Sequence, residues 1–215
     1  MIRAGRVTPD EMVDANVHVV DRGSIRADPN YVVEGPTTAS VGEPTPECGR
    51  IETPVYNLLV EHPEGTILWD TGSHPDAGSG HWPSELYAEF EHYDAADRDL
   101  ETALGEIGYR IEDVDYVIQS HLHPDHAGGL HRFAGTDTPV FVHREELKHA
   151  YYSAKTDAGE DAYLPADFDR DLEWRIVHGD RETHFEGIEL LHLPGHTPGL
   201  MGMRIDLENA GTVVF

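Results

Sequence analysis

Three imidazoles and one carboxylate are concentrated in one short segment, His121-Leu122-His123-Pro124-Asp125-His126. A compact apolar run, Val114 to Gln119, precedes this segment and predicts a β-strand, and the pair Gly128-Gly129 follows it. The histidines are therefore expected at the carboxyl end of a strand. Most of the 15 histidines in the chain are expected to be solvated or locally hydrogen-bonded, whereas this concentration of donors indicates a metal site.

The spacing within the segment predicts two ligand positions. His121 and His123 are two residues apart on an extended turn, so their side chains point to the same side and can chelate one ion. Asp125 and His126 follow the turn imposed by Pro124 and are expected to face a second position nearby.

Cysteine is not expected among the ligands of the predicted metal site. The chain contains a single cysteine, Cys48, in proline-rich surroundings far upstream of the histidines, and it is expected to be inert. An internal disulfide and a cysteine-based zinc knuckle are excluded. Imidazole and carboxylate without thiolate suit Zn²⁺, with Mn, Fe and Co as alternatives.

The chain is strongly acidic, with 15 Lys and Arg against 41 Asp and Glu and a formal net charge of -26. This excess disfavours a nucleic-acid partner and RNA processing, because binding a phosphate backbone draws on clustered Lys and Arg. An acidic, lysine-poor surface is also typical of proteins from a high-salt cytoplasm, where salt screens the self-repulsion. We favour this halophilic interpretation, under which the charge describes the solvent rather than the substrate.

Length and hydropathy predict one soluble domain, residues 1–215. A chain of 215 residues can bury one substantial core and is too short for two independent domains of typical size. It has no apolar run of about eighteen residues, and Met1 to Asp14 lacks the apolar stretch of a secretory signal. The expectation is a cytoplasmic protein with a small-molecule substrate and no membrane partner, whose oligomeric state the sequence leaves open.

Alternating strand and helix signals predict an α/β fold. The proline- and glycine-rich residues 34–54 are expected to be irregular, and Val55 to Val60 and Thr66 to Trp69 predict a hairpin that Asp70-Thr71-Gly72 terminates. A helix is expected at 100–107, capped by Asp97 and stopped by Gly108. The second half predicts a helix at 143–153 and strands at 139–142, 175–177, 188–193, 200–205 and 212–215.

Residues 73–97 are rich in Gly, Pro, His and aromatic residues, without a clean period, and are expected to form a partly helical excursion. The aromatic residues between His81 and Tyr93 allow two interpretations. They can form an apolar lip for an acyl chain, or they can simply anchor a long loop.

The His-x-His-x-Asp-His motif at 121–126, the later Gly195-His196-Thr197-Pro198-Gly199 and the earlier Asp70-Thr71-Gly72 together resemble the metallo-β-lactamase superfamily. Within it, residues 120–129 and the layout of residues 54–72 resemble the N-acyl homoserine lactonases, although Pro124 stands where some lactonases carry an aromatic residue. The similarity covers roughly residues 50–215 and implies an αββα sandwich.

The resemblance also implies a set of roles. His121, His123 and His196 would hold a first Zn²⁺, and Asp125 and His126 a second. Water activated by the two ions would open a lactone or related ester, with Asp125 passing a proton to the leaving alkoxide. Asp70 would orient the cluster, and the alternative for that residue is a strand-end carboxylate that caps its own turn.

Members of the family have, after the strand matching residues 212–215, an aspartate that bridges the two metals and later a further histidine. The chain stops at Phe215, before the position of that aspartate. The expectation is therefore a C-terminally truncated domain whose αββα fold is incomplete in its C-terminal half. Its first metal site has all its protein ligands, and its second has Asp125 and His126 alone.

Three other functions remain as alternatives. A glyoxalase-II-like thioesterase would use the same ligands on a different bond. A di-iron oxygen or nitric oxide reductase is less favoured, because those proteins place a glutamate where this chain has His123. The non-enzyme alternative is an inactive truncated fragment that binds one metal ion or none.

Overall fold

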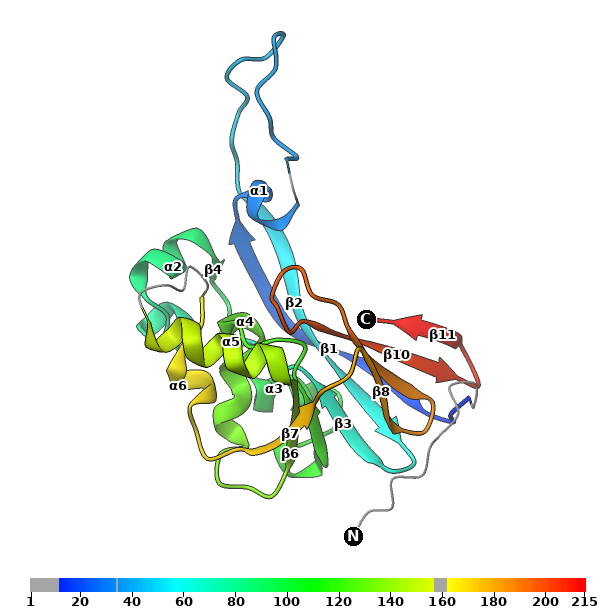
Figure 1. Ribbon diagram of the computed structural model, residues 1–215. Coiled ribbons are helices and arrows are strands. Elements are labelled where there is room, and N and C mark those ends of the chain that lie inside the picture. The colour runs from blue at the N-terminus through cyan, green and yellow to red at the C-terminus, as the bar shows by residue number, and fades with distance from the viewer. Residues whose placement is uncertain (1–11, 34, 157–161) are drawn as a thin grey trace.

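The computed structural model describes residues 12–33, 35–156 and 162–215, in which two β-sheets pack face to face (Figure 1). The larger sheet has seven strands in the order β4-β1-β2-β3-β5-β6-β7, and the smaller has four in the order β11-β10-β9-β8. The strands of the larger sheet are β1 (Asn16–Ala27), β2 (Ile51–His62), β3 (Gly65–Trp69), β4 (Glu91–His92), β5 (Tyr116–Ile118), β6 (Pro139–His143) and β7 (Glu173–Val177). Those of the smaller sheet are β8 (Arg181–Phe185), β9 (Ile188–His192), β10 (Met201–Leu207) and β11 (Gly211–Val214).

Helices gather on one side of the larger sheet, opposite the smaller one (Figure 1). The α-helices are α1 (Pro29–Val32), α2 (Ser84–Glu89), α3 (Leu100–Glu106), α4 (Pro124–Ala127), α5 (Arg144–Lys155) and α6 (Pro165–Phe168), and the 3-10 helices are η1 (Ala77–Ser79), η2 (Ile111–Asp113) and η3 (Gly128–Arg132). The described residues thus form a helical layer followed by two sheets, in agreement with the expected α/β class. None of the described helices is long and apolar enough to cross a membrane.

The central strands of the larger sheet are buried on both faces, as their apolar runs require. In β2, Leu59 belongs to the core under the helices, while Leu58 and Val60 belong to the core between the two sheets. Strand β3 repeats this alternation, with Leu68 on the helical side and Ile67 on the other. Because the side-chain period of a strand is two, each run fills both cores at once.

Strand direction determines where the loops of interest meet. Strands β1, β2 and β3 are antiparallel neighbours, whereas β3, β5, β6 and β7 run parallel to one another. The carboxyl ends of β3, β5 and β6 consequently lie at one edge of the sheet, the edge at which open α/β sheets bind ligands.

The expected hairpin is confirmed as β2 and β3, but several boundaries were wrong. Helix α3 is capped by Asp99 rather than Asp97, and Oδ1 of Asp99 accepts hydrogen bonds from the backbone N–H groups of Glu101 and Thr102. Strand β8 was not expected, because its polar sequence has no strand period and it pairs with the buried strand β9. Strand β1 is a long strand paired with β2, and residues 35–50 form an irregular loop that projects from the sheets (Figure 1).

Candidate metal centre

Two loops, one between β5 and α4 and one between β9 and β10, place the three histidines at the carboxyl edge of the larger sheet. Strand β5 ends at Ile118, and His123 is the N-cap residue of α4, which begins at Pro124. Proline suits this first helical position, because its fixed φ matches the helix and its missing N–H needs no partner there. His196 comes from the loop between β9 and β10. The backbone N–H of Met201 donates to the carbonyl of Ser120 at 2.8 Å and so ties the two segments together.

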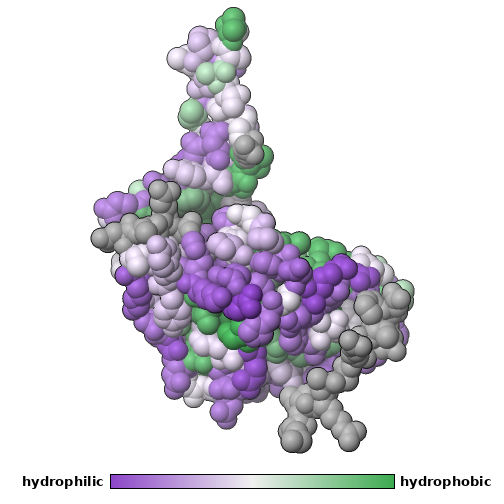
Figure 2. Space-filling view, in the orientation of Figure 1, coloured by the Kyte–Doolittle hydropathy of each residue, from purple (hydrophilic) through white to green (hydrophobic). Residues whose placement is uncertain are grey.

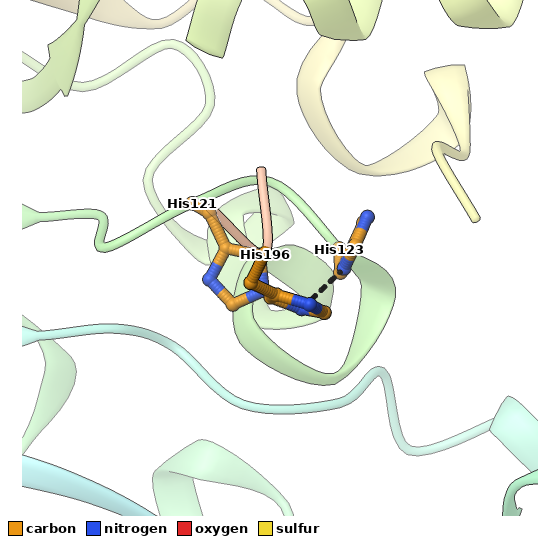
Figure 3. A group of neighbouring side chains, drawn as sticks. All are labelled: His121, His123 and His196. Atoms are coloured by element: carbon orange, nitrogen blue, oxygen red, sulfur yellow. Dashed lines mark hydrogen bonds between the residues drawn. The ribbon is translucent and has the colours of Figure 1, made fainter. Parts of the chain in front are cut away.

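The structure brings together the three histidines that the sequence predicts as the first metal site (Figure 3). Their candidate ligand atoms all lie within 4.8 Å of one another. Nδ1 of His123 and Nε2 of His196 are 3.1 Å apart, although the two residues are separated by 73 positions in the sequence. Two nitrogens bound to one tetrahedral Zn²⁺ at about 2.0–2.1 Å are about 3.3 Å apart, so this spacing fits a shared ion.

The state of His121 also fits a metal ligand. Its side chain is buried, and among the residues that the structure describes Nε2 has no hydrogen-bond partner, whereas Nδ1 lies 3.0 Å from Oγ of Ser120. Burial, together with the neighbouring His126, His123 and His196, holds the pKa of His121 well below its usual value. The imidazole is therefore neutral and offers a lone pair, which is the form that binds a metal.

Asp70 follows β3 and reaches across to the histidine segment. Its backbone has a φ of 58°, a left-handed conformation that Asp tolerates better than most residues. Oδ1 accepts a hydrogen bond from the backbone N–H of Ser120 at 2.7 Å, and Oδ2 lies 2.8 Å from Nδ1 of His126. The carboxylate thus bonds to the neighbouring strand end and the short helix rather than capping its own turn.

Asp125 and His126 lie together on α4, with Oδ2 of Asp125 at 3.5 Å from Nε2 of His126. Burial lowers the pKa of His126, but the carboxylates of Asp125 and Asp70 outweigh this effect and raise the pKa to about 9. Because Nδ1 of His126 is engaged by Asp70, Nε2 is the nitrogen that faces Asp125.

A cavity of about 310 Å³ opens at the site. Its polar residues are Asp70, Ser120, His121, Asp125 and His126, and its other lining residues are Pro54, Val55, Tyr56, Trp69, Leu193, Leu200, Met201, Gly202 and Phe215. An apolar wall therefore stands directly beside the candidate ligands.

The aromatic segment 81–93 does not contribute to the lining of this cavity. Trp82 is 3% exposed and packs in a separate core with Ile25 and Ala27. Trp82 thus anchors the excursion to the sheet, which supports the loop-anchor interpretation for this residue.

Two buried charged residues near the site were not predicted. Arg22, on β1, donates to the backbone carbonyls of Thr71 and Ser73 in the loop that follows Asp70. Glu146, on α5, is fully buried and accepts a hydrogen bond from the backbone N–H of Leu122 at 2.9 Å. Helical spacing contained the signal for Glu146, because it shares the buried face of α5 with Ala150 and Ser153.

Comparisons with known proteins agree with this geometry. The model of the metallo-beta-lactamase superfamily matches residues 50–215. The chain is 30% identical over 199 residues to N-acyl homoserine lactonase AiiB of Agrobacterium fabrum, covering 88% of this chain and 71% of that protein. It is 36% identical over 168 residues to an N-acyl homoserine lactonase of Bacillus cereus, covering 76% of this chain and 63% of that protein.

Among solved structures, an N-acyl homoserine lactone hydrolase with the product N-hexanoyl-L-homoserine at its catalytic metal centre superposes with a TM-score of 0.77. The two share 28% sequence identity, and the match covers 94% of this chain and 74% of that one. The fold, the three converging histidines and these relatives lead to one assignment: the chain belongs to the metallo-beta-lactamase superfamily.

Proposed function

We propose that the chain is a metal-dependent hydrolase that opens the ring of N-acyl homoserine lactones or closely related lactones. The observation that carries this proposal is the convergence of three histidine nitrogens beside a cavity whose wall is largely apolar. The relatives named above are lactonases, and one of them holds an N-acyl homoserine product at its metal centre.

In this proposal His121, His123 and His196 hold one Zn²⁺, and Asp125 and His126 contribute to a second position. A divalent cation in such a site polarises a carbonyl oxygen and lowers the pKa of water.

The protein's own groups have distinct tasks. Asp70 accepts from Nδ1 of His126 and fixes the orientation of that ring. Asp125 lines the cavity, where its carboxylate can take a proton from the attacking water and deliver it to the alkoxide released when the ring C–O bond breaks. The apolar lining beyond these groups, including Tyr56 and Leu193, suits the acyl chain.

The test is a hydrolysis assay of the chain loaded with Zn²⁺. N-hexanoyl homoserine lactone and an S-acyl glutathione thioester are supplied in separate reactions, and their rates are compared. Ring opening releases a carboxylic acid, which a pH indicator detects. We expect lactone hydrolysis to exceed thioester hydrolysis and to fall at least about 100-fold in His123→Ala, because one of the three ligands of the first site is lost.

Cys48→Ser is the matched control, because Cys48 is exposed and is not among the residues that line the cavity. Its lactone hydrolysis should equal that of the unaltered chain. Faster thioester hydrolysis would support the glyoxalase-II-like alternative. Binding of one metal ion or none, without hydrolysis of either substrate, would support the inactive fragment.

A further inference from the structure

Helix α5 places a buried carboxylate between the two segments that carry the histidines. Glu146 lies in the first turn of α5 and has no exposed surface. Within the described part of the chain, no Lys or Arg side chain lies within salt-bridge distance of its carboxylate. A buried carboxylate without a cationic partner must be satisfied by hydrogen bonds.

Each carboxylate oxygen of Glu146 accepts hydrogen bonds from a different histidine-bearing segment. Oε1 accepts from the backbone N–H of Leu122 at 2.9 Å and from the hydroxyl of Tyr163 at 2.8 Å. Oε2 accepts from the hydroxyl of Thr197 at 2.7 Å and from the backbone N–H of Gly199 at 3.2 Å. Leu122 stands between His121 and His123, and Thr197 follows His196, so one side chain spans both sources of ligands.

The approach of the second segment to α5 is unusually close. A Cβ atom added at Gly199 would lie 2.0 Å from the backbone nitrogen of Glu146 and 2.4 Å from its Cα. Only glycine fits such an approach, which brings the β9–β10 loop directly over the first turn of the helix. Tyr163, which donates to Oε1 of Glu146, also contacts the first segment: the centroids of its ring and the ring of His123 are 4.8 Å apart.

We propose that Glu146 is a positioning residue for the three-histidine centre, because its carboxylate holds the segment of His121 and His123 in register with the segment of His196. This inference rests on the metal site in the proposed function. A tetrahedral site tolerates only small errors in ligand position, so a shift of one segment against the other weakens metal binding before it disrupts the fold.

Glu146→Gln is the sharpest variant, because it keeps the shape of the side chain and converts one acceptor into a donor. In one amide orientation the NH₂ group faces the N–H of Leu122, and in the other it faces the N–H of Gly199. A hydroxyl can rotate to accept, but a backbone N–H cannot. Either orientation therefore costs one of the two segments its backbone hydrogen bond to residue 146, from Leu122 or from Gly199.

The experiment measures the affinity for Co²⁺ in competition with a chromophoric chelator, in the absence of substrate. Glu145→Gln is the matched control, since it makes the same charge change one residue away on a side chain that is 36% exposed. We expect Glu146→Gln to weaken Co²⁺ binding at least about 10-fold and Glu145→Gln to leave it within about twofold. Equal affinities in the two variants, with both folded, overturn the proposal.

Two milder variants decide the matter if Glu146→Gln does not fold. Tyr163→Phe removes one donor from Oε1, and Thr197→Val removes one donor from Oε2. At least one of them should weaken Co²⁺ binding by a measurable factor in a folded protein. If both bind Co²⁺ as tightly as the unaltered chain, the proposal is wrong.

A metal-free readout separates this inference from the proposed function. The imidazole NMR signals of His121, His123 and His196 should shift in Glu146→Gln and stay unchanged in Glu145→Gln, while those of His184, on β8, stay unchanged in both. Loss of global stability alone does not move the signals of the folded state. If the unaltered chain binds no Co²⁺, the metal site fails, and these ring signals still decide the role of Glu146: unmoved signals refute it.

Discussion

Oδ2 of Asp70 lies 2.8 Å from Nδ1 of His126, and the same carboxylate accepts the backbone N–H of Ser120 through Oδ1. Asp70 is 3% exposed, so this contact is shielded from water. The arrangement joins the end of β3 to the end of β5 and to α4 through one side chain.

Replacement of Asp70 by Asn should weaken metal binding at the Asp125–His126 position about 10–100-fold. The amide cannot accept from both Ser120 and His126, so the ring of His126 loses its fixed orientation. Isothermal titration with Zn²⁺ measures the effect. Asp76→Asn, at a side chain that is 68% exposed, is the control, and an equal affinity in the two variants would contradict the prediction.

Arg22→Met should lower the free energy of unfolding by about 3–5 kcal/mol. The guanidinium is buried and donates to the side chain of Asn57 and to the backbone carbonyls of Thr71, Ser73 and Arg98, and methionine leaves these acceptors unsatisfied. Urea unfolding followed by circular dichroism measures the change.

The control for this substitution is Arg175→Met, at a side chain that is 51% exposed and paired with Glu173. A surface pair of this kind contributes about 0–1 kcal/mol. The explanation fails if Arg22→Met is no more destabilising than Arg175→Met.

Gly128→Ala should lower the free energy of unfolding by about 3 kcal/mol. The added Cβ would lie 2.1 Å from the backbone nitrogen of His74, and backbone cannot move aside as a side chain can. Gly105→Ala in α3 should instead raise stability by about 0.5–1 kcal/mol, because no described atom beyond the neighbouring helix backbone lies within 4 Å of the added Cβ and Ala favours the helix. Thermal unfolding of the two variants tests whether Gly128→Ala lowers the melting temperature and Gly105→Ala raises it.

Stability should fall between pH 6.5 and about 4 in part because of His74. Burial, with the neighbouring His81 and His131, lowers the pKa of His74 from 6.5 to about 4. In this window the unfolded chain binds the proton and the folded chain does not, so acid favours unfolding. His74→Asn should make the fall shallower, and His178→Asn should not; identical pH profiles of urea unfolding would refute this assignment.

Added KCl should raise the free energy of unfolding. The formal net charge is -26, and hydrophilic side chains cover most of the face seen in Figure 2. Between about 0.1 and 1 M salt the screening length falls from about 10 Å to about 3 Å, which relieves the repulsion among like charges. Urea unfolding across this range measures the effect, and a midpoint independent of KCl would count against the halophilic interpretation.

The local order of residues was enough to predict much of the site. His121, His123, Asp125 and His126 are so close in sequence that a strand end followed by a turn must bring their side chains near one another. The apolar runs of β2, β3 and β6 can likewise be recognised as strands from adjacent residues in the sequence, without knowledge of tertiary contacts. His196 was placed by a motif, and the fold brings it to the others across 73 positions.

Features that depend on long-range contacts, namely the cap of α3, strand β8 and the burial of Glu146, were decided by the tertiary structure alone. Capping by Asp99 rather than Asp97 depends on where the chain enters α3, and β8 is a strand because β9 offers it a pairing edge. Acidic residues such as Glu145 and Glu146 look alike in the sequence. Packing exposes the first to solvent and buries the second among four donors, because α5 turns one face towards the two loops that carry the histidines.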